Sequence, residues 1–171
     1  AGALSTTQVR ALDVSDVASL RTGTFAALSN AQLAALGTGA MAALATSHTA
    51  SLRTSQITAL LGRQLASLST ASLNAWAAPQ FAALSTAQLA ALTTLQAANL
   101  ETADFAVLGT AQVQALGTSQ VASLSTASVF ALSTAQVAAL GTAQVLALTR
   151  LEVIALQTTA LAAMGTVQAA A

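Results

Sequence analysis

Few side chains in this sequence could take part in acid–base, nucleophilic or metal chemistry. His48 is the single histidine, and the chain contains no cysteine. Asp13 and Asp16 lie close together beside Arg10. A metal site needs several ligands that converge, and a general acid–base pair needs environments that separate two pKa values. The pattern therefore predicts no metal site at His48. It predicts that Asp13 and Asp16 form a local ion pair with Arg10 rather than a catalytic pair.

The remaining reactive groups give the same result. Glu152 lies two residues from Arg150, which predicts a second local ion pair. The many serines have no base within a recognisable motif, and no glycine-rich phosphate loop is present. The sequence predicts no catalytic residue, no cofactor and no enzymatic activity.

The strongest signal is an eight-residue repeat. The phrase Leu-Ser-Thr-Ala-Gln-Val-Ala-Ala at 132–139 is followed at once by a close copy at 140–147. Counted from Leu4, such octads fit the chain 21 times to its last residue without insertion or deletion. Self-similarity at a fixed period is typical of solenoids and repeat arrays. We therefore expect residues 1–171 to form a single repeat array.

Each octad position has its own composition, numbered here from one at the leucine. Position one is Leu except at Trp76 and Met164, position six is mainly Val, Leu or Phe, and position eight is almost always Ala or Ser. No charged residue occupies these three positions, and charged side chains are rarely buried. Positions one, six and eight are therefore predicted to form the core. Position five is mostly Gln and is predicted to face outward, which makes His48 a half-exposed substitute.

The octad period favours very short helices. In one continuous α-helix, eight residues advance about 800°, so the leucines would spiral around the axis. A β-solenoid is the alternative, because Thr and Val favour strands. However, the apolar residue at position six is followed three residues later by the leucine at position one of the next octad, and this spacing does not alternate as in a strand. We predict an all-α solenoid with one helix of six or seven residues in each octad.

The start of each helix can be read from a capping pattern. Ser133 and Gln136 match a capping box, in which each side chain accepts a hydrogen bond from the other's backbone N–H. Leu132 and Val137 then occupy the hydrophobic-staple positions. This places the N-cap at position two; a cap at position three is the alternative and would put Pro79 at the first helical residue. Where position two is glycine, as at Gly141, we expect that it also permits a left-handed turn.

Composition excludes several partners. Five basic and five acidic residues give zero net charge, and only 6% of residues are charged. This leaves no basic patch for nucleic acid. A spanning helix needs about 20 mainly apolar residues, and polar residues interrupt every octad. We expect no membrane span, and the first residues do not resemble a signal peptide.

The stretches 84–92 and 132–148 resemble repeat tracts of very large bacterial surface or secreted proteins, which are often labelled as haem-utilisation or adhesion proteins. The resemblance extends over essentially the whole chain. It implies a long, extracellular or cell-surface, non-enzymatic repeat region, and it transfers no functional residue. The phrase Leu-Thr-x-x-Gln-Val also resembles the opening of repeats in transcription-activator-like DNA-binding effectors, but their longer period and basic residues are missing here.

The leading hypothesis is a structural protein that forms or extends a fibre or adhesin stalk by stacking and self-association. The residues expected to mediate self-association are large, apolar and predicted to face outward: Phe130, Leu146, Leu151 and Ile154. A second hypothesis is an ice-binding solenoid that uses the threonines of position three: Thr38, Thr46, Thr54, Thr110, Thr118 and Thr126. A third hypothesis is a solenoid that binds peptide or a surface glycan.

Overall fold

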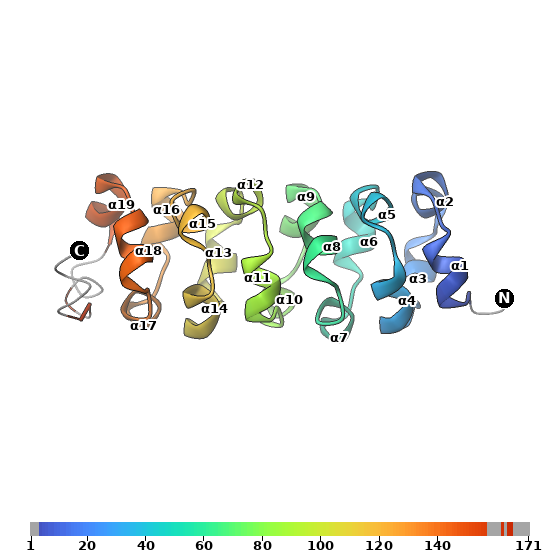
Figure 1. The fold of residues 1–171 in the computed structure, drawn as a ribbon, viewed down its shortest axis with the longest axis horizontal. Helices are drawn as coiled ribbons and strands as arrows, with labels where there is room; N and C mark the ends of the chain where they lie inside the picture. The colour runs from blue at the N-terminus through green and yellow to red at the C-terminus, as the bar shows by residue number, and fades with distance from the viewer. Residues whose placement is uncertain (1–3, 157–161, 163, 166–171) are drawn as a thin grey trace. The chain divides into compact units, whose positions relative to one another are not determined.

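The structure is a computed structural model that describes residues 4–156, 162 and 164–165. The described part consists of short α-helices joined by tight turns and contains no strand (Figure 1). It divides into two compact units, unit 1 (Ala1–Ala91) and unit 2 (Leu92–Ala171). Each of the first 19 octads supplies one helix. The all-α solenoid predicted from the octads is confirmed.

The helices of unit 1 are α1 Thr6–Arg10, α2 Val14–Ser19, α3 Thr22–Ala26, α4 Asn30–Ala35, α5 Thr38–Ala42, α6 Thr46–Ala50, α7 Thr54–Ile57, α8 Gly62–Ser67, α9 Thr70–Asn74, α10 Ala78–Ala82 and α11 Thr86–Ala90. Those of unit 2 are α12 Thr94–Ala98, α13 Thr102–Ala106, α14 Thr110–Gln114, α15 Thr118–Val121, α16 Thr126–Phe130, α17 Thr134–Ala138, α18 Thr142–Ala147 and α19 Arg150–Ala155. They are four to six residues long, so most are shorter than the predicted six or seven.

Every described helix begins after position two, so the favoured capping register is confirmed. In α17, Ser133 Oγ accepts from the N–H of Gln136 at 3.3 Å, and Gln136 Oε1 accepts from the N–H of Ser133 at 2.7 Å. The cap residue has extended backbone (φ −69°, ψ 159°), as an N-cap requires. Pro79 is the second residue of α10, where its missing N–H leaves no helical hydrogen bond unmade.

The predicted left-handed turn at glycine caps is wrong. Gly141 has φ −73° and ψ 157°, which is the same extended backbone as a serine cap. No described residue has a positive φ. Glycine at position two therefore supplies an N-cap without a side chain, and the chain turns between octads through extended residues that any amino acid can adopt.

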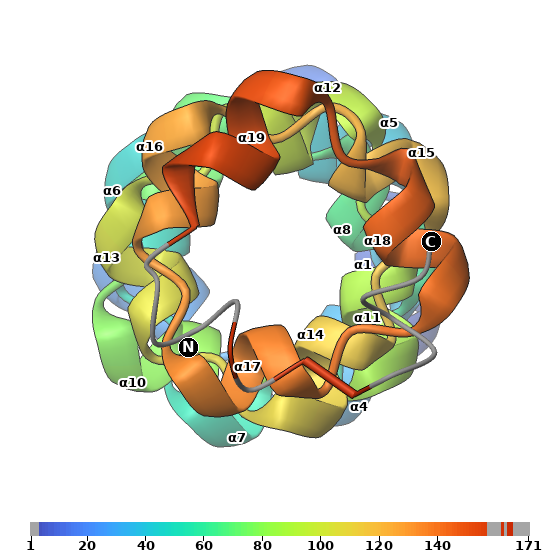
Figure 2. The same ribbon diagram turned by 90° about the vertical axis from the view of Figure 1, so that its left-hand side faces the viewer.

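Within each unit the helices wind around a common axis, as the end-on view shows (Figure 2). Each helix packs against the helix three octads away: α1 on α4 and α5 on α8 in unit 1, and α13 on α16 and α16 on α19 in unit 2. Consecutive helices therefore lie on different sides of the axis. Because isolated helices of this length are unstable in water, stacking on the next turn must stabilise each one.

The core lies inside the ring of helices. From Val9 to Val137, every position-six side chain is at most 1% exposed. The position-one leucines are also buried from Leu28 onward. Position eight was predicted to belong to the core, and this prediction is wrong, because its small side chains are mostly half-buried. They lie where the chain leaves one helix for the next, and there a small residue lets neighbouring turns approach.

No helix in the described residues is both long and apolar enough to cross a membrane.

Candidate functional site

Position five, predicted to face outward, is exposed in the first three octads but buried from Gln32 to Glu152, apart from the half-buried Gln112. Gln56 and Gln64 are fully buried, and Gln88, Gln136 and Gln144 are at most 5% exposed. A carboxamide carries one acceptor oxygen and two N–H donors, and each is costly to bury without a partner. The burial of these glutamines therefore depends on hydrogen bonds that the octad sequence does not reveal.

Gln88 shows where these hydrogen bonds go. Its Oε1 accepts from the N–H of Ser85 at 2.9 Å, which caps its own helix α11. Its Nε2 donates to the carbonyls of Ile57 and Leu60, both at 2.8 Å. Ile57 is the last residue of α7, four octads earlier, and Leu60 lies in the turn that follows α7. One side chain thus connects the start of one helix to the end of a helix in the preceding turn.

The same arrangement recurs in both units. In unit 1, Gln64 Nε2 donates to the carbonyls of Leu33 and Leu36, each at 2.8 Å. In unit 2, Gln136 donates to those of Phe105 and Leu108 at 2.7 and 2.8 Å. Gln144 donates to those of Val113 and Leu116 at 3.0 and 2.7 Å, and Gln56 and Gln80 donate in the same way in unit 1.

These bonds solve a problem created by very short helices. The last carbonyls of a helix have no partner within it, and in a helix of five residues most carbonyls are of this kind. From the next turn, Gln88 donates to the carbonyl of Ile57, which also accepts from the N–H of Leu60 at 3.0 Å, and to the carbonyl of Leu60 itself. We call this set of bonds the glutamine staple. It also fixes the winding, because bonds that span 28 and 31 residues, together with packing on the third helix, require between three and four octads per turn.

His48, predicted to be half-exposed, is 5% exposed and takes the place of glutamine in the staple. Its Nδ1 accepts from the N–H of Ala45 at 3.2 Å, and its Nε2 lies 2.8 Å from the carbonyl of Leu20. Because Nδ1 accepts, the proton of the neutral ring lies on Nε2, which donates to that carbonyl. The ring also contacts Phe25 edge to face, at 5.4 Å between centroids.

Two carboxylates also occupy position five inside the fold. Asp104 is 6% exposed, and its Oδ2 accepts from the N–H of Glu101 at 3.0 Å. Burial raises the pKa of Asp104 to about 6, although that hydrogen bond acts in the opposite direction. Glu152 is 3% exposed, and its Oε2 accepts from the N–H of Thr149 at 2.6 Å. Both keep the capping half of the staple, and a carboxylate cannot supply the donating half.

At Asp13 and Asp16, the structure shows reciprocal helix capping where the sequence predicted an ion pair. Asp13 Oδ1 accepts from the N–H of Asp16 at 2.8 Å, and Asp16 Oδ2 accepts from the N–H of Asp13 at 3.1 Å. The first of these bonds, together with that from the Ser15 hydroxyl, lowers the pKa of Asp13. Glu152 likewise caps its helix with Thr149. No group of three or more metal-ligating side chains occurs among the described residues.

The six threonines proposed for ice binding are exposed, each as the first residue of its helix. Thr38, Thr46 and Thr54 open the consecutive helices α5, α6 and α7, which lie on different sides of the ring (Figure 2). The same holds for Thr110, Thr118 and Thr126 on α14, α15 and α16. The structure therefore brings neither set together into a single line.

The four residues proposed for self-association are all exposed: Phe130 is 56%, Leu146 62%, Leu151 67% and Ile154 66% exposed. Phe130 and Ile154 lie on α16 and α19, which pack together, and Leu151 is also on α19. Leu146 lies on α18, on another side of the ring (Figure 2). Sequence reasoning missed Val14 and Val153, which are 55% and 36% exposed, and also Leu95 on α12, which is 67% exposed. Its signal is a leucine at position four, where Ala or Ser is usual.

Comparison with known families matches the ALTTAQ repeat to residues 62–94, 97–127 and 122–150. The matched stretches cover slightly more than half of the chain and span helices of both units. No match was found among curated proteins or solved structures. The repeated octad, its match to this family and its one-helix-per-octad fold agree, and the chain belongs to the ALTTAQ repeat family.

Proposed function

We propose that this chain is a structural, non-enzymatic repeat segment that extends a fibre or adhesin stalk outside the cell or on its surface. The glutamine staple is the observation that carries this proposal. The one polar side chain that recurs inside the fold uses its acceptor and both donors to join octads to one another. The repeated octad thus carries the residues that stack each turn of helices on the next. In a stalk, this stacking is itself the function, because it provides length.

The outer surface supports the same role. Thr and small residues cover most of it, and ten charged residues in 171 leave it nearly neutral. Such a surface offers no charged partner a strong site and puts little repulsion between copies of the chain. The resemblance to bacterial surface and secreted proteins agrees with a location outside the cell.

The test is whether the chain adds length in proportion to its repeats. Chains of one, two and three tandem copies are purified, and their maximum dimension is measured by small-angle X-ray scattering and electron microscopy. A stalk gives a dimension that rises by a constant increment with each copy. Compact particles whose dimension grows much more slowly contradict the proposal. Labelling of intact source cells with an antibody against the chain tests the location.

Ice binding by the position-three threonines is a separate candidate. Exposure of all six hydroxyl-bearing side chains favours it, whereas their placement on different sides of the ring gives no flat array of one set. Thermal hysteresis of the purified chain decides the matter. We expect none.

A further inference from the structure

Four large apolar side chains of unit 2 share one side of the ring. They are Leu95 on α12, Phe130 on α16, and Leu151 and Ile154 on α19, and each is 56–67% exposed. Both views place α12, α16 and α19 on the same side of unit 2 (Figures 1 and 2), and α16 packs directly on α19. We call these four residues the apolar stripe.

The apolar stripe is not needed to build the core. In unit 2 the other described residues at position four are Ala or Ser, and position seven is Ala, apart from Gln114 and the exposed Leu146. Octads with Ala at these positions form the same helices with the same buried positions one and six. Large apolar side chains left in water on one side of a protein typically mark a contact surface.

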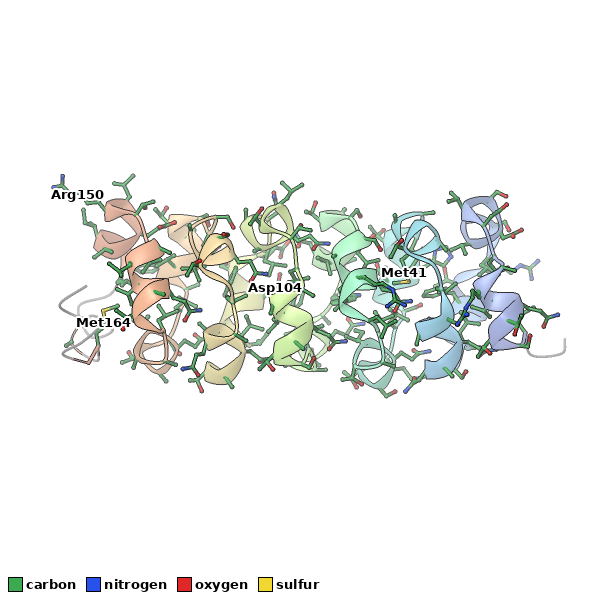
Figure 3. All side chains as sticks on the ribbon, in the orientation of Figure 1. Met41, Asp104, Arg150 and Met164 are labelled. Carbon is green, nitrogen blue, oxygen red and sulfur yellow. The ribbon has the colours of Figure 1, made fainter. Side chains whose placement is uncertain are left out.

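The charge on this side narrows the choice of partner. Arg150 is the one exposed charged residue described on α12, α16 and α19, since Glu152 is buried. Figure 3 shows Arg150 projecting away from α19, which is the last of the three helices that carry the stripe. A surface that carries a single charged side chain offers few charge–charge contacts to a charged ligand. Its complement is another apolar, nearly neutral surface.

The area fits pairing with a second copy. Four side chains exposed by more than half present on the order of 400–500 Å² of apolar surface, as large as the largest patch on a typical monomer. With the Thr and Ala side chains around them, two stripes approach the roughly 800 Å² per partner of a stable interface. The apolar stripe is the largest exposed apolar cluster on the described helices of unit 2, so its best complement is itself.

We propose that two copies of the chain pair side by side through the apolar stripe, in antiparallel orientation. A two-fold axis lets the same patch serve both copies and closes the pair. In a parallel pair the two Arg150 side chains would meet, whereas in an antiparallel pair they lie at opposite ends. This inference rests on the proposed stalk function and gives it a lateral contact.

Sedimentation equilibrium of the full chain over a range of concentrations tests the pairing. The wild type is expected to be a dimer, and Leu95→Glu and Phe130→Glu each to raise the dimer dissociation constant at least tenfold, because each buries an unpaired charge. The matched control is Leu146→Glu, an equally exposed leucine on another side, which is expected to leave the dimer unchanged. Unchanged thermal unfolding shows that all three variants still fold.

A monomeric wild type, or equal weakening by Leu146→Glu, overturns the pairing. A different result also overturns it: a monomeric wild type that binds phosphatidylcholine vesicles, with binding lost in Leu95→Glu but kept in Leu146→Glu. That result would assign the stripe to a lipid surface. The stalk function is judged separately by length: a monomer that still lengthens with each tandem copy overturns only the pairing, and particles that do not lengthen overturn the stalk function itself.

Disulfide trapping tests the orientation, because the chain has no natural cysteine. Ala127→Cys, on the central helix α16, is expected to cross-link to its own copy. Arg150→Cys is expected to cross-link with Thr94→Cys of a second chain and not with itself. Efficient cross-linking of Arg150→Cys to itself overturns the antiparallel arrangement.

Discussion

At the residue scale, the glutamine of position five is the side chain that most determines this fold. Gln88 is 5% exposed and forms one capping bond and two bonds to the preceding turn. A hydrogen bond between buried groups contributes little relative to water, but a buried group left without its partner costs about 1–3 kcal/mol. The glutamines are therefore expected to be far more sensitive to substitution than their polar character suggests.

Gln88→Glu tests this sensitivity. The variant keeps an acceptor for the N–H of Ser85 but replaces the donor to Ile57 and Leu60 by an oxygen that faces two carbonyls. We expect a loss of about 2–4 kcal/mol in the free energy of unfolding at pH 7. Urea denaturation followed by circular dichroism measures it. The control is Gln114→Glu at an exposed position seven, and equal losses for the two variants contradict the staple.

Asp104 gives a prediction for pH. Burial raises its pKa to about 6 in the folded chain, above the ordinary 3.8. Such a group favours the folded state at pH below 3.8 and loses that contribution as the pH rises through 6. Asp104→Asn is therefore expected to unfold with a free energy about 1–2 kcal/mol higher than the wild type above pH 6, since solvent screens part of the shift. Near pH 4 the difference is expected to fall toward zero.

Urea denaturation of both proteins at several pH values measures this difference, with Asp13→Asn as a matched control. The pKa of Asp13 is lowered by its hydrogen bonds, so its substitution is expected to destabilise the chain most at neutral pH. A pH-independent gain for Asp104→Asn contradicts the buried ionisable carboxyl.

At the scale of one element, the packing of α8 shows how closely neighbouring turns approach. Gly62 opens α8 where Thr is usual, and a Cβ added there lies 2.7 Å from the Cβ of Ala91. Two methyl groups cannot occupy that distance, so one turn must shift. Small residues at this contact therefore set the spacing of turns within unit 1.

Gly62→Ala is expected to destabilise unit 1 by about 1–3 kcal/mol, because overpacking forces the turns apart. Adding Ala91→Gly is expected to restore part of the loss. The control is Gly23→Ala, which meets nothing within 4 Å and is expected to gain about 0.5–1 kcal/mol of helix propensity. Trp76, the single tryptophan and a buried residue of unit 1, reports unfolding by fluorescence. Stabilisation by Gly62→Ala contradicts the close contact.

At the scale of the whole molecule, the direction in which each helix faces depends on the number of octads before it. Packing on the third helix and bonding to the fourth means that each octad turns the chain by roughly a quarter to a third of a revolution. Removal of one octad within a unit leaves the capping and core residues of the other octads unchanged. It rotates the helices after the deletion about the axis of that unit, relative to the helices before it.

Deletion of residues 108–115, the octad of α14, is therefore expected to preserve helical content while moving α12 out of line with α16 and α19. The expected result is a normal circular dichroism spectrum per residue and a dimer dissociation constant raised at least tenfold. Deletion of residues 28–35 in unit 1 is the control, because it leaves the apolar stripe intact. A dimer that survives the first deletion with unchanged affinity shows that alignment of the stripe does not matter.

Local chemistry was enough to predict the elements. The capping box at Ser133 and Gln136 and the spacing of Leu132 and Val137 concern residues within one octad, so the N-cap register, the helical class and the buried positions one and six could be read directly. The outward positions of Phe130, Leu146, Leu151 and Ile154 followed by exclusion from that core and agree with their exposure.

The tertiary structure alone decided which groups meet across turns. Nothing within an octad shows that Gln88 donates to Ile57 and Leu60, because those carbonyls become neighbours only when the chain has wound through between three and four octads. Because no hydrogen-bond partner for these glutamines lies beyond the cap of their own octad, the sequence predicted them to be surface residues, and it predicted the same for His48. The number of octads per turn likewise separated Leu146 from Phe130 and aligned Leu95 with it. The sequence determined the repeating helix by itself, whereas the winding, which depends on packing between distant octads, determined which residues act together.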